Sequence, residues 1–403
     1  MEKLIKNKAH LIALAFILLF GIYLRWYHVE YPVIGYHNWK AEHYLSEAKN
    51  FAREGFFKYG FFVPMRDTTE SVDEESGGAH NDTFPTISII VGFFFMLFGE
   101  NLALARVINI LFSIGTVAAF YFLIKKLFEK EILALLSALL MAINPMYVFF
   151  SHNVDVINPG VFFMVLGAYL YVSWHKRQTE IRTLYFAAFA VVMAIITKYT
   201  FVVIVFPILA TFPYKKFMKK ENFKQLAILG GIASIFPLWF TYSELYVKKY
   251  IFGRALSANV LDSYEITKLI DFSVISDVGF WNTMNYYLRD NFTIIGIWFS
   301  IIGMVLFIYL FFQNNEKFGY RFTLAYLASL ILFVIVMGFK LSGHSYHQFP
   351  VGPLIIFMMA YFIYVIGFNL ENLTKVKHFS YIFTIIMVFV APLPSTSVYA
   401  RSI

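Results

Sequence analysis

The chain has 403 residues, of which 59% are hydrophobic and only 14% are charged, and its mean hydropathy is +0.65. Soluble domains carry about 25% charged residues, so this composition excludes an ordinary soluble fold and indicates a polytopic membrane protein. The absence of cysteine excludes disulfides, thiolate metal sites and a cysteine nucleophile. The net charge of +8 is typical of basic cytoplasmic loops and does not indicate a nucleic-acid partner.

The first apolar run follows a basic N-terminus. The segment KLIKNK (3–8) precedes LIALAFILLFGIYL (11–24), an arrangement that resembles a signal peptide. No small-residue cleavage site follows, because the next residues are Arg25, Trp26 and Tyr27. We therefore expect a retained first membrane span.

Eleven apolar runs predict transmembrane helices, so the expected fold is an all-α bundle that forms a single domain over 1–403. The predicted spans are 9–26, 104–124, 132–150, 159–174, 183–197, 200–213, 225–242, 292–312, 322–340, 349–369 and 379–400. A twelfth run, TISIIVGFFFMLFG (86–99), is shorter than the roughly 20 residues that cross a bilayer.

The distribution of basic residues decides how the run 86–99 is interpreted. If it does not cross, 18 of the 33 lysines and arginines fall in six segments on the side of the N-terminus. If it did cross, all later basic loops, including 214–224, would lie opposite the N-terminus. An excess of Lys and Arg in short loops marks the cytoplasmic face. The pattern predicts a cytoplasmic N-terminus and an interfacial or re-entrant helix over 86–99.

This topology predicts two long extracytoplasmic segments, 27–103 and 243–291, and three short outer turns at 151–158, 197–200 and 341–348. Polar side chains that are unusual for membrane loops gather on that face, and such a gathering indicates a functional site. They are His37, Lys40, Glu42, His43, His80, Asp82, His152, Asp155, Lys198, Arg254, His344 and His347.

The segment 37–55 predicts an amphipathic helix in the first outer loop. From Ala41 onward its apolar residues recur at the i, i+3, i+4 spacing of a helix face, with Asn38 as N-cap and Gly55 as stop. Glu42 falls in the first turn, where the helix dipole favours an ionised carboxylate that can accept a proton from a hydroxyl. The alternative is a plain interfacial anchor with solvated charges.

Five stretches, in this order and on this predicted side, resemble the GT-C membrane glycosyltransferases, in particular the protein O-mannosyltransferase and aminoarabinose transferase group. They are His37-x-Trp39-Lys40 with Ala48-Lys49-Asn50-Phe51 and Gly55; Phe84-Pro85 with Leu97-Phe98-Gly99-Glu100 and Ala105-Arg106; Asn144-Pro145 with Ser151-His152-Asn153; Thr197-Lys198-Tyr199; and His344-Ser345-Tyr346-His347-Gln348-Phe349-Pro350. Together they span roughly residues 35–360.

The resemblance implies an inverting transfer of a sugar from a polyprenyl-phosphate carrier to an acceptor hydroxyl at the outer face. The acceptor can be a protein, a lipid or a glycan, and the enzyme is expected in the plasma or inner membrane. A carboxylate would act as general base, and cations would offset charge on the leaving phosphate. The expected donor-phosphate ligands are Lys198, His344, Tyr346, Lys40 and Arg254; further pocket residues are His37, His43, His80, His152, His347 and Gln348.

The family's carboxylate positions fall beside acids of this chain. The first-loop acid aligns with His43, or with Lys40 of another branch; the other two align with Ile157 and Thr83. The neighbouring carboxylates Glu42, Asp155 and Asp82 are therefore the candidate bases. This displacement keeps open a catalytically silent GT-C-like subunit, and a lipid or solute transporter is a weaker alternative because paired repeats with broken helices are not evident.

The acidic stretch SVDEESGGAH (71–80) allows a weak divalent-cation site or a cover over an acceptor groove. A solvated loop explains the same composition. No other feature of the sequence implies a cofactor, and the expected partners are the lipid-linked donor, membrane lipids and the acceptor.

Overall fold

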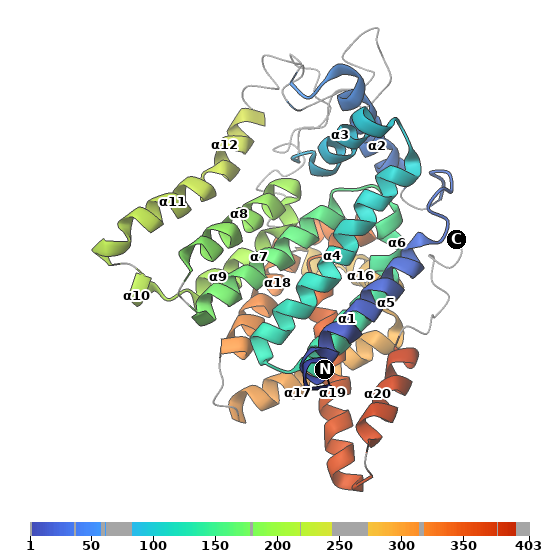
Figure 1. Cartoon of the computed structure of the whole chain (residues 1–403), viewed down its shortest axis with the longest axis vertical. Helices are drawn as coiled ribbons and strands as arrows, with labels where there is room; N and C mark the ends of the chain where they lie inside the picture. The colour runs from blue at the N-terminus through green and yellow to red at the C-terminus, as the bar shows by residue number, and fades with distance from the viewer. Residues whose placement is uncertain are drawn as a thin grey trace.

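We describe the fold from a computed structural model that covers residues 2–35, 38–57, 61, 83–177, 180–217, 219–243, 273–313, 318–376 and 378–391. Within these ranges the chain is helical and has no strand, and the long helices form a bundle capped at one end by α2 and α3 (Figure 1). The all-α membrane fold expected from composition is confirmed.

Most helices of the bundle follow the apolar runs of the sequence, and they vary in length. They are α1 (Glu2–Trp26), α4 (Leu102–Phe128), α5 (Glu131–Ile143), α6 (Pro145–His152), α7 (Ile157–Arg177), α8 (Ile181–Thr197), η1 (Tyr199–Ile204), α9 (Val205–Thr211), α11 (Phe223–Ala233), α12 (Ile235–Thr241), α16 (Val278–Phe292), α17 (Ile294–Gln313), α18 (Phe318–Leu341), α19 (Gly352–Thr374) and α20 (Phe379–Val390). Shorter elements are α10 (Tyr214–Phe217), η2 (Lys220–Asn222), α15 (Ser273–Ser276) and η4 (Ser345–Gln348).

Each of the eleven predicted spans coincides with helical structure, but they differ in length. Among the described residues, seven helices are long and apolar enough to cross a membrane, and α5 with α6 makes an eighth if this pair, bent by 50°, counts as one span. The bend falls at Asn144-Pro145, where proline lacks the N–H that would continue the helix. The remaining predicted spans correspond to the shorter helices α8, η1 with α9, and α20.

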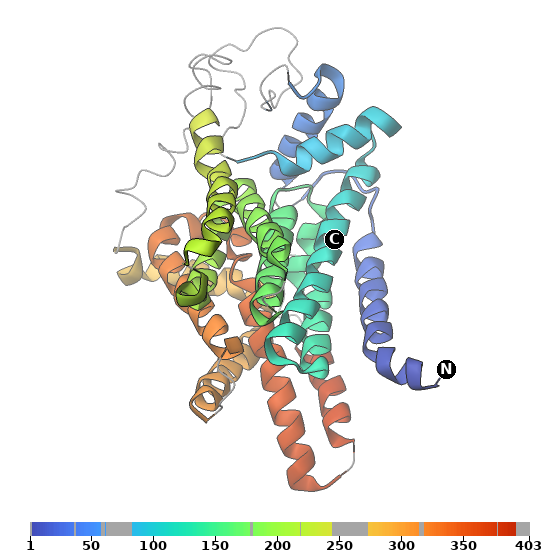
Figure 2. The ribbon, with the colours of Figure 1, turned by 60° about the vertical axis from the view of Figure 1, so that its left-hand side comes forward.

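Successive spans run in opposite directions, so the connecting turns lie at two ends of the bundle in both views (Figures 1 and 2). At the end with α2 and α3, the Phe84 N–H donates to the Ile196 carbonyl at 2.8 Å, and the Thr86 and Thr197 hydroxyls are 2.6 Å apart. At the end with the N-terminus, Lys125 lies 3.0 Å from Glu131, and Lys176 lies 2.6 Å from Glu129. The predicted outer and inner turns therefore lie at opposite ends.

Helices α2 (Asn38–Glu54) and α3 (Thr86–Phe98) pack together as a cap on the bundle. Gly92 of α3 allows this approach, because a Cβ there would lie 2.9 Å from the Ala48 carbonyl oxygen of α2. The buried residues of the pair form one apolar cluster with Val154 and Val156, from the turn before α7. The two helices of the first outer loop are thus fixed against the spans.

Helices α11 and α12 stand at the periphery of the bundle (Figure 1). The apolar segment Lys220–Thr241 that contains them has none of its residues buried inside the protein. An apolar cavity lies between α12 and the neighbouring helices η1, α9 and α18.

Candidate active site

The site is centred on Lys198, at the break between α8 and η1. Its backbone is extended (φ −157°, ψ 116°), and its side chain is only 5% exposed. The Nζ atom lies 5.5 Å from the centroid of the Tyr346 ring, an arrangement typical of a cation–π contact. A buried lysine at a membrane interface is favourable only beside such partners or an anion.

Tyr346 belongs to a chain of rings that links η4 to the first outer loop. His344 stacks on Tyr346 with ring centroids 5.0 Å apart, and it also contacts the ring of Trp39 of α2 at 5.9 Å. The His347 ring lies 4.6 Å from Tyr346. The predicted site residues of 344–347 and of α2 are therefore brought together.

Lys40 adds a second cation beside this chain of rings. Its Nζ lies 4.5 Å from the Trp39 ring and 5.9 Å from the Tyr44 ring, and the residue is buried. Because Trp39 also contacts His344, Lys40 and Lys198 flank the same aromatic group from α2 and from the α8–η1 turn.

Buried amides hold η4 in place. The Asn291 amide donates to the Gln348 side-chain oxygen at 2.8 Å and to the Ser345 carbonyl at 3.1 Å. The Asn144 amide in turn donates to the Asn291 carbonyl at 3.0 Å. Gln348, which was expected as a ligand, is thus part of this network. Asn291 was not predicted as a site residue; the feature that could have indicated it is its position as a polar residue immediately before an apolar run.

Asp155 is the buried carboxylate among the predicted bases. Its Oδ1 accepts the Ile157 N–H at 3.2 Å and so caps the start of α7. The residue is 3% exposed, and its neighbours Val154 and Val156 pack in the cluster formed with α2 and α3. The hydrogen bond described for Asp155 uses one oxygen, which leaves Oδ2 as a proton acceptor beside the α2–α3 cap.

Glu42 lies on the exposed side of α2, whereas Glu47 is the buried carboxylate of this helix. The Glu47 Oε1 atom lies 3.0 Å from His43 Nε2, and the Ser88 hydroxyl of α3 donates to Oε2 at 2.7 Å. His43 is thus engaged with Glu47 four residues on. Glu47 was not among the predicted site residues, although its i, i+4 spacing from His43 is a sequence signal for such a pair.

His152 lies in a different cavity from the Lys198 site. Phe150 of α6 contacts Tyr346, with centroids 6.2 Å apart, whereas Phe149 and His152 line a separate cavity together with Arg106. Phe150 and His152 of α6 therefore face different surroundings.

Four predicted site residues, His37, His80, Asp82 and Arg254, lie outside the described residues, as does the acidic stretch 71–80. Across the described ranges, no three His, Asp or Glu side chains gather as metal ligands would.

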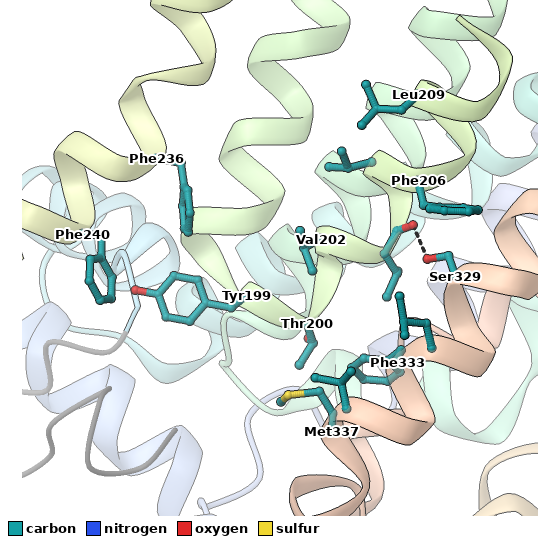
Figure 3. A pocket seen from close by; sticks show the side chains of 14 residues that line it. Tyr199, Thr200, Val202, Phe206, Leu209, Phe236, Phe240, Ser329, Phe333 and Met337 are labelled. Carbon is teal, nitrogen blue, oxygen red and sulfur yellow. Dashed lines mark hydrogen bonds between the residues drawn. The ribbon is translucent and has the colours of Figure 1, made fainter. Parts of the chain in front are cut away.

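An apolar cavity of about 540 Å³ begins at Tyr199, the residue that follows Lys198 in the chain (Figure 3). Its walls come from η1 with α9, from α12 and from α18, and they include Tyr199, Val202, Phe206, Leu209, Phe236 and Phe333. The Ser329 hydroxyl in the wall is occupied, since it donates to the Val203 carbonyl at 2.6 Å. The space is an apolar groove that runs from Tyr199 along the helix to Leu209.

The fold and this gathering of polar residues at the α2–α3 end of the bundle define a polytopic membrane protein of the GT-C-like fold. Residues 82–240 match the family described as dolichyl-phosphate-mannose-protein mannosyltransferase, and this segment contains Asp155, Lys198 and part of the groove. The expected resemblance to GT-C glycosyltransferases is confirmed. No curated protein sequence matches the chain.

Solved structures of the archaeal oligosaccharyltransferase AglB from Archaeoglobus fulgidus are similar in fold. The complex with an inhibitory peptide and a dolichol-phosphate has 12% sequence identity and a TM-score of 0.61, and the match covers 99% of this chain and 56% of that chain. The complex with Zn and sulfate has 13% identity and a TM-score of 0.58, with 97% and 52% covered. The chain therefore spans about half the length of that oligosaccharyltransferase.

Proposed function

We propose that this protein is an inverting glycosyltransferase that moves a hexose or pentose from a polyprenyl-phosphate carrier to an acceptor hydroxyl at the extracytoplasmic face of the cell membrane. The observation that carries the proposal is an apolar groove that begins beside a buried lysine. Such a pair matches the two ends of the donor, a long hydrocarbon chain and a phosphate. The similarity in fold to a protein solved with dolichol-phosphate supports this assignment.

In this proposal the groove holds the proximal part of the polyprenyl chain. The stretch from Tyr199 to Leu209 spans roughly 15–20 Å at helical rise, about half the hydrocarbon thickness of a bilayer. Its α12 wall is unburied, so a lipid can enter sideways from the membrane. A chain lying there has its phosphate at the Tyr199 end, next to Lys198.

Lys198 would bind the donor phosphate as an ion pair, with His344 and the Tyr346 hydroxyl as further donors. As the bond between the sugar C1 and the phosphate oxygen breaks, its electron pair passes to the phosphate, and the charge on that group increases. Cations held in a dry site stabilise such charge more than they stabilise the starting state, which accelerates the reaction. Lys40 supplies a second cation on the other side of Trp39.

A carboxylate would remove the acceptor proton as the acceptor oxygen bonds to C1 from the face opposite the phosphate. A single displacement of this kind inverts C1. Asp155, Glu42 and Asp82 are the candidates, and position favours Asp155, because it is buried beside the cluster that α2 and α3 form with Val154 and Val156. The acceptor, a protein, lipid or glycan hydroxyl, would approach from the side of α2 and α3.

Transfer by the purified protein from radiolabelled polyprenyl-phosphate sugars, with product anomer determined by NMR, tests the proposal. We expect transfer with inversion, lost in Lys198→Met and Asp155→Asn but kept in Lys219→Met, an exposed lysine at the opposite end. Binding of the donor without transfer to any acceptor class would instead support the catalytically silent subunit. Retention of the anomeric configuration would contradict the single displacement.

A further inference from the structure

A second polar cavity lies at the same end of the bundle. It has a volume of about 110 Å³ and lies between the end of α1, the following loop, Arg106 of α4 and the end of α6. Its lining includes Tyr27, His28, Tyr31, Arg106, Val148 and His152. None of the groove or Lys198-site residues belongs to this lining.

Arg106 contributes the positive charge of this cavity. Its Nη1 donates to the carbonyls of His28, Val29 and Tyr31, and its Nε donates to the His152 carbonyl at 3.2 Å. The described hydrogen bonds do not involve Nη2. The residue is 6% exposed and lines the cavity, so a nearly buried cation forms part of the cavity wall.

A second buried arginine, Arg25, lies in the last turn of α1. Arg25 is fully buried, and it donates from Nε to Ser113 and from Nη1 to the carbonyls of Gly21 and Ala142, while Nη2 has no partner. His152, whose carbonyl accepts from Arg106 Nε, lines the same cavity. Among the described ion pairs none includes Arg25 or Arg106, and the nearby acid Glu30 is exposed.

Two buried guanidinium groups without a carboxylate leave an uncompensated positive charge, and buried charges are normally paired. The surroundings indicate where the anion comes from. Tyr23, Trp26, Tyr27 and Tyr31 are exposed around the cavity, and such an aromatic belt marks the level of the lipid headgroups. Helix α1, which forms one wall, has mostly unburied residues facing the membrane.

We propose that this cavity binds the phosphate of an anionic membrane lipid, with Arg106 as its main ligand and the Tyr27 and Tyr31 rings against its glycerol portion. The site is distinct from the proposed donor site, and the lipid there is not consumed. Its occupancy neutralises Arg106 and fixes α1 and the loop 27–35 against α4 and α6.

The test compares the protein in nanodiscs of phosphatidylcholine alone and of an equal mixture with phosphatidylglycerol. Retained lipid is counted by native mass spectrometry, and the melting temperature is measured in parallel. We expect wild type to retain phosphatidylglycerol selectively and to melt higher in the mixture. Arg106→Gln should weaken retention by at least about tenfold, or about 1.4 kcal/mol. Arg182→Gln, an exposed arginine at the opposite end, should behave as wild type.

Arg106→Gln also removes bonds to the loop, so a second variant separates folding from binding. Val148→Phe keeps every Arg106 hydrogen bond and fills the cavity, and it should abolish selective retention without unfolding the protein. Unchanged retention in Val148→Phe would overturn the proposal. So would equal stabilisation by inorganic phosphate in pure phosphatidylcholine discs, because the site would then bind free anions and not a lipid.

Discussion

The ammonium of Lys198 lies over the ring of Tyr346, 5.5 Å from its centroid, and joins the α8–η1 turn to η4 across 148 residues of sequence. In the proposed reaction this lysine offsets charge that grows on the leaving phosphate. We expect Lys198→Met to lower kcat for transfer by roughly 10²–10³-fold, the usual effect of removing one donor to a developing oxyanion. Equal activity of Lys198→Met and the control Lys219→Met would contradict the role of Lys198.

We predict opposite outcomes for substitutions of Asp155 and Glu42, because Asp155 is buried and Glu42 is exposed. Asp155→Asn should reduce kcat by roughly 10²–10⁴-fold, as expected for a lost general base, with little change in stability because asparagine also caps a helix. Glu42→Gln should leave kcat near wild type. The reverse pattern, measured by the same transfer assay on both variants, would assign the base to Glu42.

Glu47 gives a prediction about folding. Its carboxylate is bound to His43 and Ser88 in the interface between α2 and α3. Glu47→Ala removes the carboxylate from both contacts, and the loss of such buried hydrogen bonds to a charged group costs about 1–3 kcal/mol of unfolding free energy. Denaturation in detergent should show this loss, and Glu42→Ala, on the exposed side, is the control. A double-mutant cycle with Ser88→Ala should show coupling; strict additivity would mean that the bond does not stabilise the interface.

The contrast between Glu42 and Glu47 shows what the sequence could predict. The spacing of Ala41, Tyr44 and Ala48 predicted the buried face of α2, and these residues are buried. An apolar pattern, however, cannot indicate a charged residue on the same face. Glu47 is buried because α3 supplies a hydroxyl from 41 positions further along the chain, and that pairing depends on packing.

The turns of the site were easier to predict than the connections between them. The order of the spans and the positions of the basic loops predicted that the turns 151–158, 197–200 and 341–348 lie at the same end of the bundle. Helices that cross a membrane one after another leave few other arrangements of their turns. Phe150 contacts Tyr346, whereas Phe149 and His152 line a separate cavity, and the sequence did not predict this division. Helices α5 and α6 are also bent by 50° at Asn144-Pro145, and the sequence gives no measure of a bend.

Close packing of α17 on α19 depends on Gly303. A Cβ there would lie 2.0 Å from the Met358 carbonyl oxygen, so the helices must separate if any side chain is added. Small residues are what allow membrane helices to approach this closely. Gly303→Ala should lower the melting temperature markedly. At Gly230 nothing lies within 4 Å of an added Cβ, so Gly230→Ala should raise the stability by no more than about 1 kcal/mol.

The groove predicts a dependence on the length of the donor chain. Leu209 lies at the end of the groove far from Lys198, so Leu209→Trp blocks the distal part and leaves the phosphate end open. For a full-length polyprenyl donor, KM should rise by roughly tenfold, because a few buried methylenes are worth more than about 1.4 kcal/mol. For a donor shortened to its first isoprene units KM should stay unchanged, since that chain ends before Leu209. Leu238→Trp, an exposed leucine of α12 outside the lining, is the matched control. If Leu209→Trp weakened both donors equally, the polyprenyl chain would have to lie elsewhere on the bundle.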